Sequence, residues 1–528
     1  MSSTVVAIDL GASSGRVLRG IFTDGCLVVE ECSRFHNGPV LVPVNGVGDY
    51  EWDILALWRG IREGLTEAAR RGPVDAIGID SWAVDYGLVD DEGRLVGNPA
   101  SYRSKRTANA VNRVFESMDA DELYRLNGLQ FQPFNTMFQL IADRDQGRSS
   151  RGTRMLMIPD LLGYWLTNRH VCEVTNASTT GMVDPRSRMW STGVGDVLRS
   201  NFGVDTASLL PELVEPGTII GPVRVEDIDL RTREGNPTPL VAVGSHDTAS
   251  AVVAVPAVED DSAADLTVKL SDPGSPAASA DHSASAQPTF GFISSGTWSL
   301  VGMELDEPVL SQASRSANFT NELGVDGTVR YLKNIMGMWV QQECLRQWRS
   351  QGMAQMSWPV LDAETEASDP MRTLFDINDS SFLTPGDMCG RISRWCEEHG
   401  EPVPQTRAQV LRSITESLVV AYRRALREAE SLSGRSLDVI HIVGGGSKNV
   451  LLCQSTADAT GHPVIAGPVE GTAVGNMVVQ LRAVGAISGG LDALRRVVVN
   501  STDLVRYEPR PTEYETWEAA ERRVFGDR

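Results

Sequence analysis

Two stretches in opposite halves of this chain share one pattern: a short apolar strand turns through small residues and returns as a second strand. The first is VVAIDLGASSGRVL, residues 5–18, and the second is FGFISSGTWSLVG, residues 290–302. Short apolar runs that end at glycine are typical of buried strands. Because 528 residues are too many for one hydrophobic core, the repeated hairpin predicts two related domains.

Strands and helices are expected to alternate around both hairpins. The expected strands are Thr4–Leu10, Arg16–Phe22, Cys26–Phe35, Asp75–Ile79, Phe290–Ser294, Trp298–Met303 and Asp438–Val443. Helices are expected over 53–70, where apolar residues recur at helical spacing, near Lys333–Arg349 and over Ala408–Ser431. This alternation predicts a layered α/β fold.

The composition is that of a soluble globular protein with a strong negative charge. Hydrophobic residues make up 41% of the chain, charged residues 22%, and the formal net charge is −21. Such a charge argues against nucleic acid or an anionic membrane as the main partner. It does not argue against a nucleotide ligand, because a glycine-rich turn and a metal ion supply positive potential locally.

Several features predict a cytoplasmic protein. The N-terminal MSSTVVAIDLGAS has no basic region before its apolar run, unlike a signal peptide. No run of about 18 apolar residues that could span a membrane occurs. The seven cysteines are odd in number, scattered and without a CxxC motif, which is typical of thiols in a reducing compartment. Cys389 and Cys396 are near enough in sequence to pair, and the spacing leaves that question open.

Residues 258–288 differ from the rest of the chain. They are rich in alanine, serine, aspartate and proline and have no hydrophobic period. Such a composition predicts a flexible surface insertion.

Three glycine-containing turns could bind phosphate. In AIDLGASSGR, residues 7–16, the turn leaves backbone N–H groups free, Asp9 could hold Mg²⁺ through water, and Arg16 could approach a phosphate. SSGTWSL, 294–300, offers a matching turn, and VGGGSKN, 443–449, places three glycines between a strand and a helix. None is a Walker A loop or a GxGxxG motif, and for each a purely structural turn is the alternative.

GSHDTASA, residues 244–251, sets a carboxylate among small residues after an apolar run. Asp247 could cap a helix, bind a metal with His246, or act as a general base. No HxxxH pair occurs among the seven histidines, which makes a zinc site the weakest of the three. A base in phosphoryl transfer needs only to orient the hydroxyl and accept its proton late.

The stretch GIDSWAVDYGLVD, residues 78–90, is expected to be a strand that carries acidic and aromatic side chains near its end. Asp80, Trp82, Asp85 and Tyr86 are of the types that bind sugar hydroxyls. A partly buried strand with a polar end is the alternative.

Taken together and in this order, the quoted stretches resemble the FGGY carbohydrate kinases. Further markers of the resemblance are GLQFQPFNTMFQL (128–140), IPDLLGYWLTN (158–168), EVTNASTTGMVDP (173–185), NFTNELGVDGTVRYLKNIMGMWVQQE (318–343) and AGPVEGTAVGN (466–476). No single turn is specific, but the ordered set runs from about residue 4 to about residue 490.

The resemblance implies two ribonuclease H-like domains, of the actin and hexokinase type, that flank a central cleft. Their expected extents are 1–243 and 244–528. It also implies transfer of the ATP γ-phosphate to the C1 hydroxyl of L-rhamnulose, with Mg²⁺ and with Asp247 as the base. The site residues that it implies are Ala83, His246 and Thr248 at the sugar, Ala12, Ser13, Ser14, Gly15 and Arg16 at the phosphate, and Thr297, Asn334, Gln342 and Gly445 at the nucleotide.

Two departures from the family pattern bear on the sugar. Ala83 stands where the family usually has glycine, and Ser104 stands where an aspartate is more usual. Another ketose, such as L-fuculose or L-xylulose, therefore stays open as the acceptor. A nucleotide-dependent binding protein without catalysis is the alternative of a different class, and the intact GSHDTASA motif argues against it.

Overall fold

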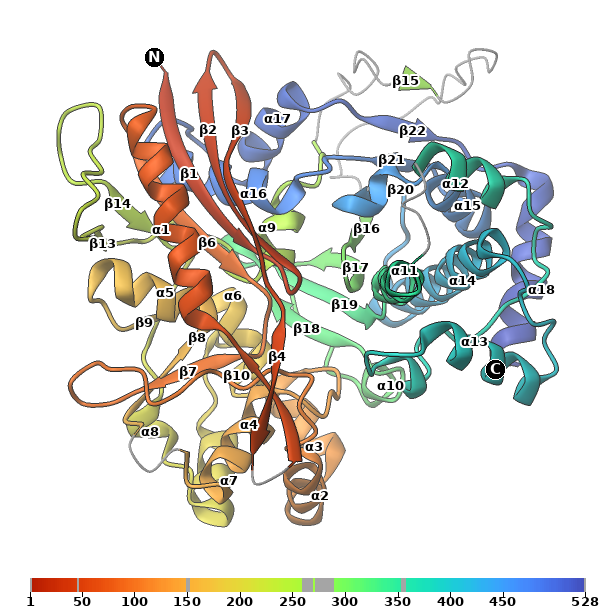
Figure 1. Cartoon of the computed structure of the whole chain (residues 1–528), viewed down its shortest axis with the longest axis horizontal. Helices are drawn as coiled ribbons and strands as arrows, with labels where there is room; N and C mark the ends of the chain where they lie inside the picture. The colour runs from red at the N-terminus through yellow and green to blue at the C-terminus, as the bar shows by residue number, and fades with distance from the viewer. Residues whose placement is uncertain are drawn as a thin grey trace. The chain divides into compact units, whose positions relative to one another are not determined.

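The computed structural model describes residues 2–44, 47–148, 152–258, 269–270, 289–352 and 358–526, and the chain packs as two compact units (Figure 1). Unit 1 comprises Met1–Pro256, Glu304–Tyr331 and Gly471–Thr502, and unit 2 comprises Ala257–Met303, Leu332–Glu470 and Asp503–Arg528. Both units are therefore built from segments that are distant in the sequence. Among the described residues, no helix is long and apolar enough to cross a membrane.

The main sheet of unit 1 has the strand order β13-β14-β6-β1-β2-β3. These strands are β1 Ser3–Leu10, β2 Ser14–Thr23, β3 Cys26–His36, β6 Ala76–Ser81, β13 Ile219–Pro222 and β14 Pro239–Val241. β1, β2 and β3 form an antiparallel meander, whereas β6 is parallel to β1 and β14 is parallel to β6. Three parallel strands therefore end at the same edge of the sheet.

Helix α1 (Ile54–Arg70) packs against β2 and β3. Its N-cap Asp53 accepts a hydrogen bond from the Ala56 amide at 3.0 Å. The other helices of unit 1 are α2 Ala108–Ser117, α3 Ala120–Asn127, α4 Thr136–Asp145, α5 Ile158–Thr167, α6 Val174–Ala177, α7 Thr192–Phe202, α8 Thr206–Leu209, α9 Asp247–Val253, α10 Gln312–Ser316, α16 Gly471–Ala483 and α17 Leu491–Ser501. Its smaller strands are β4 Pro39–Val44, β5 Val47–Trp52, β7 Tyr86–Val89, β8 Arg154–Met157, β9 Val171–Glu173, β10 Val183–Asp184, β11 Met189–Trp190, β12 Glu212–Val214 and β18 Thr320–Leu323.

Unit 2 repeats the same plan. Its strands are β15 Lys269–Leu270, β16 Phe290–Ser295, β17 Ser299–Leu305, β19 Val329–Ile335, β20 Val439–Val443, β21 Val464–Ala466 and β22 Val505–Tyr507. With β18 at the end, they form an eight-stranded sheet in the order β15-β22-β21-β20-β16-β17-β19-β18. Two of these strands are shared between the units, because the end of β17 from Glu304 and the start of β19 up to Tyr331 belong to unit 1. β17 is antiparallel to β16, and β20 and β21 continue the sheet in parallel. The series β19-β17-β16-β20-β21 thus corresponds to β3-β2-β1-β6-β14, which confirms the predicted pair of related domains.

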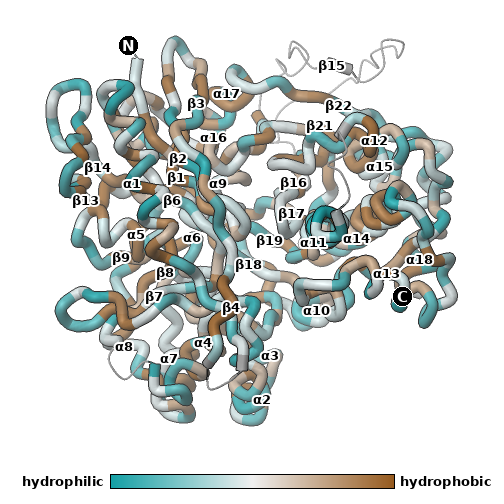
Figure 2. The backbone as a smooth tube through the Cα atoms, in the orientation of Figure 1, coloured by the Kyte–Doolittle hydropathy of each residue, from teal (hydrophilic) through white to brown (hydrophobic). Residues whose placement is uncertain are grey.

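The helices of unit 2 are α11 Trp339–Ser350, α12 Trp358–Glu366, α13 Met388–His399, α14 Arg407–Ser433, α15 Val450–Thr460 and α18 Tyr514–Phe525. α14 begins at a capping box, in which Thr406 and Gln409 bond each other's backbone amides, and it buries a long apolar face, brown in Figure 2. α11 is largely hydrophilic and appears teal in the same view.

Most of the elements expected from the sequence are confirmed, but two are wrong. The helix expected near Lys333–Arg349 begins only at Trp339, because β19 continues to Ile335 and Gly337 then turns the chain with a φ of +55°. Residues 78–90 are not one strand. They form the end of β6 and the whole of β7, separated by a bend in which Val84 has a φ of +65°.

Two further expectations are not decided by the structure. The boundary between residues 243 and 244 stays a prediction about the two domains, since the compact units group the chain by packing and mix segments from both halves. The insertion expected at 258–288 lies outside the described residues apart from Val258 and the two residues of β15.

Helices α9 and α16 approach each other very closely in unit 1. A Cβ on Gly475 would lie 1.8 Å from the Ser250 carbonyl oxygen, so this position accepts only glycine. The contact belongs to an apolar cluster that includes Val5, Val243 and Val474. Helix α9, which starts at Asp247, is held against the sheet in this way.

Hydrogen bonds to a buried carboxylate, Glu173, fix the turn that leads into α9. Its Oε2 accepts hydrogen bonds from the Ser245 amide at 2.9 Å and from the Ser245 hydroxyl at 2.6 Å. The same side chain accepts from the Thr175 amide and hydroxyl at 2.8 and 2.6 Å. Glu173 therefore fixes the backbone at residue 245 and, through it, the start of α9.

Asp160 of α5 is a second buried carboxyl in this region. Its Oδ1 accepts from the Glu173 amide at 3.1 Å, whereas Oδ2 has no hydrogen-bond partner among the described residues. Burial raises the pKa of Asp160 to about 8. The carboxyl therefore keeps its proton in the folded protein over a pH range in which the unfolded chain has lost it.

We predict that Asp160→Asn changes how stability depends on pH. Between about pH 4 and 8 the native state binds the extra proton, so the free energy of unfolding of the natural protein falls as pH rises, by up to about 1.4 kcal/mol per unit. Asparagine cannot ionise, and the variant should lose this slope. Urea unfolding at several pH values measures it. Parallel curves for the two proteins would contradict the prediction, and Asp196→Asn, at a side chain 66% exposed, serves as the control.

We predict that Gly475→Ala lowers the free energy of unfolding by about 2 kcal/mol. Helix propensity alone favours alanine by roughly 0.8–1 kcal/mol, but overlap with the Ser250 carbonyl forces the helices apart, at a cost that exceeds this gain. Gly221→Ala is the matched control, because its Cβ would meet the nearest atom, in Arg169, at an ordinary 3.5 Å. Equal stability of the two variants would contradict close packing of α9 on α16.

Candidate active site

Three aspartates gather where the parallel strands of unit 1 end. Asp9 at the end of β1 is the direct register partner of Asp80 in β6. Ser81 is bridged in parallel to His246, and the Ser81 amide donates to the Ser245 carbonyl at 2.9 Å. The residue after His246 is Asp247, so the strand register brings the three carboxylates to one edge of the sheet.

Asp80 is completely buried and is the most perturbed of the three. Its Oδ2 accepts a hydrogen bond from Asn476 Nδ2 at 2.5 Å, and Oδ1 has no partner among the described residues. Burial, followed by the nearby Asp9 carboxylate, holds the pKa of Asp80 well above its usual range. Asp80 therefore takes up a proton more readily than a hydrated carboxyl, which reduces the electrostatic cost of neighbouring carboxylates.

Asp9 is neutralised differently, by an ion pair with Arg16 across the β1–β2 hairpin. The predicted first phosphate turn, Ala12 to Arg16, connects these two residues. The Gly11 amide donates to the Ser14 carbonyl at 2.9 Å, and Asn37 Nδ2 donates to the Gly11 carbonyl at 2.7 Å. A Cβ on Gly15 would lie 2.2 Å from the Phe35 ring, so packing requires this glycine.

Asp247 is the first residue of α9, and its carboxylate does not cap the helix. The N-cap is His246, whose side chain makes no capping hydrogen bond. Asp247 Oδ1 accepts from the Thr248 hydroxyl at 3.1 Å and lies 3.4 Å from His246 Nε2. Desolvation raises the pKa of Asp247, although its side chain remains 32% exposed, against 7% for Asp9. Of the three carboxylates, Asp247 is the one that a substrate can reach.

The described residues contain no group of three histidine, cysteine, aspartate or glutamate side chains arranged to hold a metal ion. The prediction that Asp9 holds Mg²⁺ is not tested by this observation, because Mg²⁺ commonly takes only one or two protein carboxylates and fills its shell with water and phosphate oxygens.

Ala83 lies in the bend between β6 and β7 and is half-buried. The next residue, Val84, is held in its unusual backbone conformation by three contacts. Its amide donates to Thr179 Oγ1 at 3.3 Å. Its carbonyl accepts from Thr136 Oγ1 at 2.6 Å and from Gln139 Nε2 at 3.2 Å. The backbone beside Ala83 is therefore rigid, and a change of one methyl group there cannot be relaxed easily.

Asp85, which we considered as a sugar ligand, has a structural role instead. Its Oδ2 accepts from Trp52 Nε1 at 2.6 Å, from Trp82 Nε1 at 3.1 Å and from the Tyr102 amide at 3.1 Å. Gln139 Nε2 donates to Oδ1 at 2.9 Å. Burial outweighs these bonds and raises the pKa of Asp85 to about 6. A carboxylate with four donors and no exposure has little capacity left for a ligand.

The residues predicted to contact the nucleotide all belong to unit 2. Thr297 is at the β16–β17 turn, where its carbonyl accepts from the Trp339 amide at 3.0 Å, so this turn lies against the start of α11. Asn334 is in β19, Gln342 is exposed on α11, and Gly445 is exposed in the short helix Gly445–Lys448. A Cβ on Gly446 would lie 2.0 Å from Ser295 Oγ, which brings the glycine run close to the β16–β17 turn.

Sequence reasoning missed several residues that build the site. Asn476 and Gln480 of α16 form a chain to Asp80, with Gln480 Nε2 donating to Asn476 Oδ1 at 2.5 Å. Glu173 is the first residue of EVTNASTTGMVDP (173–185), and no role was predicted for it. A four-residue spacing of two amide side chains in an otherwise apolar helix was a signal for Asn476 and Gln480.

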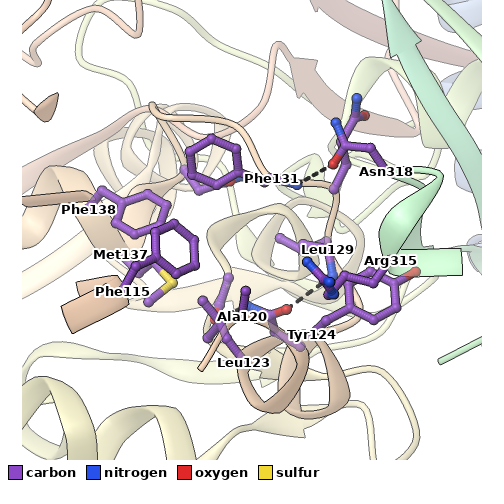
Figure 3. Close-up of a pocket in the computed structure, with 14 residues that line it drawn as sticks. Phe115, Ala120, Leu123, Tyr124, Leu129, Phe131, Met137, Phe138, Arg315 and Asn318 are labelled. Atoms are coloured by element: carbon purple, nitrogen blue, oxygen red, sulfur yellow. Dashed lines mark hydrogen bonds between the residues drawn. The ribbon is translucent and has the colours of Figure 1, made fainter. Parts of the chain in front are cut away.

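A hollow in unit 1 is aromatic and shares no residue with the predicted site. Phe115, Phe131, Phe138 and Tyr124 contribute rings to its lining, as Figure 3 shows. Asn318 Oδ1 accepts from the Phe131 amide at 3.0 Å at its edge. Its lining residues include no carboxylate.

Comparisons with known proteins agree with this architecture. Residues 4–254 match the N-terminal domain of the FGGY family of carbohydrate kinases, and residues 291–484 match its C-terminal domain. The chain is 37% identical to the rhamnulokinase of Bacteroides thetaiotaomicron, over 98% of each chain. It is 36% identical to the rhamnulokinase of Enterococcus faecalis, over 96% of this chain and 94% of that one.

Solved structures of more distant proteins share the fold. Gluconate kinase from Lactobacillus acidophilus superposes with a TM-score of 0.72 at 16% identity, over 99% of this chain and 96% of that one. Plasmodium falciparum glycerol kinase with ADP gives 0.72 at 15% identity, over 98% and 96%. With both domain matches and relatives above 35% identity along nearly its whole length, the chain belongs to the FGGY family of carbohydrate kinases.

Proposed function

We propose that this chain transfers the γ-phosphate of ATP to the C1 hydroxyl of L-rhamnulose and gives L-rhamnulose 1-phosphate, with Asp247 as the general base. The observation that carries the proposal is Asp247 itself, a partly desolvated carboxylate that stays reachable beside two buried ones. The choice of sugar is supported by the rhamnulokinase relatives, which span nearly the whole chain.

The two carboxylate oxygens of Asp247 have different neighbours. Thr248 Oγ1 and His246 Nε2 both face Oδ1. Oδ2 is then the atom that orients the sugar hydroxyl and accepts its proton. Phosphoryl transfer has a loose transition state, so the base need not deprotonate the hydroxyl before attack. The raised pKa of Asp247 makes the carboxylate a better proton acceptor than a fully hydrated one.

The other residues at the sheet edge suit the phosphate side of the reaction. Asp9 and Asp80 would hold Mg²⁺, which prefers oxygen ligands, and the unpartnered buried Oδ1 of Asp80 is an oxygen that such an ion would satisfy. When bound, the ion would neutralise the negative charge of the phosphates. Arg16 and the backbone of Ala12 to Gly15 would approach phosphate oxygens, and Thr297, Asn334, Gln342 and Gly445 would contact the nucleotide.

Ala83 is the observation that keeps another ketose as a second candidate. Its methyl group stands on a rigid bend where the family usually has glycine. A cytoplasmic location is also part of the proposal, and it suits cysteines that are all free thiols in the structure.

Release of ADP by the purified protein with Mg²⁺-ATP tests the function. The sugar panel is L-rhamnulose, L-fuculose, L-xylulose, D-xylulose and glycerol. Preference for L-rhamnulose is the expected result. Preference for another ketose would keep the kinase and change the substrate, whereas binding of ATP without turnover of any sugar would favour the non-catalytic binding protein.

We predict that Asp247→Asn lowers kcat by about 10²–10⁴-fold, because asparagine cannot accept the proton. Affinity for ATP, measured by calorimetry, should change less than about threefold. Asp326→Asn is the control, since Asp326 forms an ion pair with Arg482 and has no place in the proposed site. Near-normal turnover by Asp247→Asn would remove this residue from the mechanism.

We predict that Ala83→Gly changes the ratio of kcat/KM between ketoses and leaves the KM for ATP unchanged. One methyl group in a sugar pocket is worth about 1 kcal/mol, or roughly fivefold. Initial rates with each ketose at saturating ATP measure the ratio. An effect confined to ATP would contradict the placement of residue 83 at the sugar.

A further inference from the structure

His246 lies between the candidate base and two buried charges. Its ring is 6% exposed, with Nε2 3.4 Å from Asp247 Oδ1 on one side. On the other side, Nδ1 lies 3.2 Å from Arg330 Nη1 and 3.1 Å from Glu322 Oε2. All four residues belong to unit 1, with Glu322 in β18 and Arg330 in the part of β19 that counts with this unit.

Arg330 is held in one position. Its side chain is 0% exposed, and Nη1 lies 2.9 Å from Glu322 Oε2. Nε and Nη2 each donate to the Leu323 carbonyl at 3.1 Å, and Nη2 also donates to the Thr175 carbonyl at 3.4 Å. Burial alone would raise the pKa of Glu322, but the Arg330 charge holds it below its usual value, so the carboxylate balances the guanidinium.

The contact between Arg330 and His246 determines where the imidazole carries its proton. A guanidinium nitrogen is only a hydrogen-bond donor. In its contact with Arg330 Nη1, Nδ1 is therefore the acceptor and carries no proton. The ring proton is then on Nε2, which faces Asp247 Oδ1. Glu322 Oε2 also lies 3.1 Å from Nδ1, but it has no partner in hydrogen-bond geometry among the described residues, so Arg330 and not Glu322 is the partner of Nδ1.

We infer that Arg330 is a positioning residue, which fixes His246 in the tautomer with the proton on Nε2 so that His246 holds Oδ1 of Asp247 and leaves Oδ2 for the substrate hydroxyl. The catalytic consequence rests on the proposed function. The tautomer itself does not, because it follows from the hydrogen-bond chemistry of Arg330 and His246.

The tautomer can be read by NMR without any substrate. The full-length protein is labelled with ¹⁵N-histidine, and long-range ¹H–¹⁵N correlations distinguish a proton on Nε2, on Nδ1 or on both. The chain has only seven histidines, and the signal that disappears in His246→Gln identifies His246. We expect the Nε2–H tautomer. A proton on Nδ1, alone or in addition, would overturn the inference.

Arg330→Lys tests the role of the guanidinium. Lysine keeps the positive charge beside Glu322 but loses the planar fork that reaches the carbonyls and Nδ1 together. We expect the His246 spectrum to shift toward Nδ1–H and kcat to fall about tenfold or more, with the KM for the sugar changed less than threefold. An unchanged spectrum and an unchanged kcat would overturn the inference.

Arg423→Lys is the matched control, because Arg423 is also a buried arginine with a glutamate partner, Glu521, 3.0 Å from its Nε, and it belongs to unit 2. It should leave the His246 spectrum and kcat as they are. If Arg330→Lys does not fold, the spectrum of the natural protein decides alone. A natural protein that shows the Nε2–H tautomer but phosphorylates no sugar would refute the proposed function and leave the tautomer assignment standing.

Discussion

The candidate site depends on the parallel register of β1, β6 and β14. Parallel neighbours end at the same edge of a sheet, so residues at the ends of these strands meet although they are far apart in sequence. Asp9 and Asp80 are direct partners in this register, and Ser81 is bridged to His246. A shift by one residue would turn Asp80 to the other face of the sheet. Every carboxylate of the site is therefore placed by main-chain hydrogen bonds.

Bringing carboxylates together has an electrostatic cost, and unit 1 offsets it separately for each one. Asp9 has Arg16, and Asp80 combines a raised pKa with an amide donor from Asn476. Asp247 keeps some contact with solvent. Because Arg16 pairs with Asp9 and the pKa of Asp80 is raised, the field that acts on Asp247 is smaller than three free charges would produce.

How far the sequence predicts this molecule depends on how local each interaction is. Both hairpins, α1 and α14 were predictable, because their periodicity, glycines and caps are local signals. The bend at Val84 was not, since a β-branched residue rarely adopts a positive φ and the side chains that hold it, Thr136 and Thr179, come from later segments. The helix expected from Lys333 failed because sheet pairing overrode a pattern that also suited a helix.

The same distinction applies to the site. Asp9 ends an apolar run just before a small-residue turn, and Asp247 stands among small residues after such a run, so both were candidates from local sequence. Asn476 is 396 residues from Asp80, Glu173 is 72 residues from Ser245, and Arg330 is 84 residues from His246. Such partners have no local pattern, and only the fold brings them together. Their roles stay predictions until the variants are measured.

The two units share one strand arrangement, but the residues at the corresponding position of the hairpin are charged in unit 1 and uncharged in unit 2. In unit 1 Asp9, near the end of the first strand, lies two residues before Gly11, and its hairpin partner is Arg16. In unit 2 the corresponding position, two residues before Gly296, is Ser294, and its hairpin partner is Leu300. The turn in unit 2 therefore has no charge of its own, and its close neighbours are glycine backbone. A neutral turn lined by small residues can accept a bulky anionic ligand without first breaking an ion pair, whereas a turn with a carboxylate requires a cation or a proton nearby. The proposed function assigns the nucleotide to the uncharged turn and the proton and metal chemistry to the charged one, and this difference between the two hairpins is consistent with that assignment.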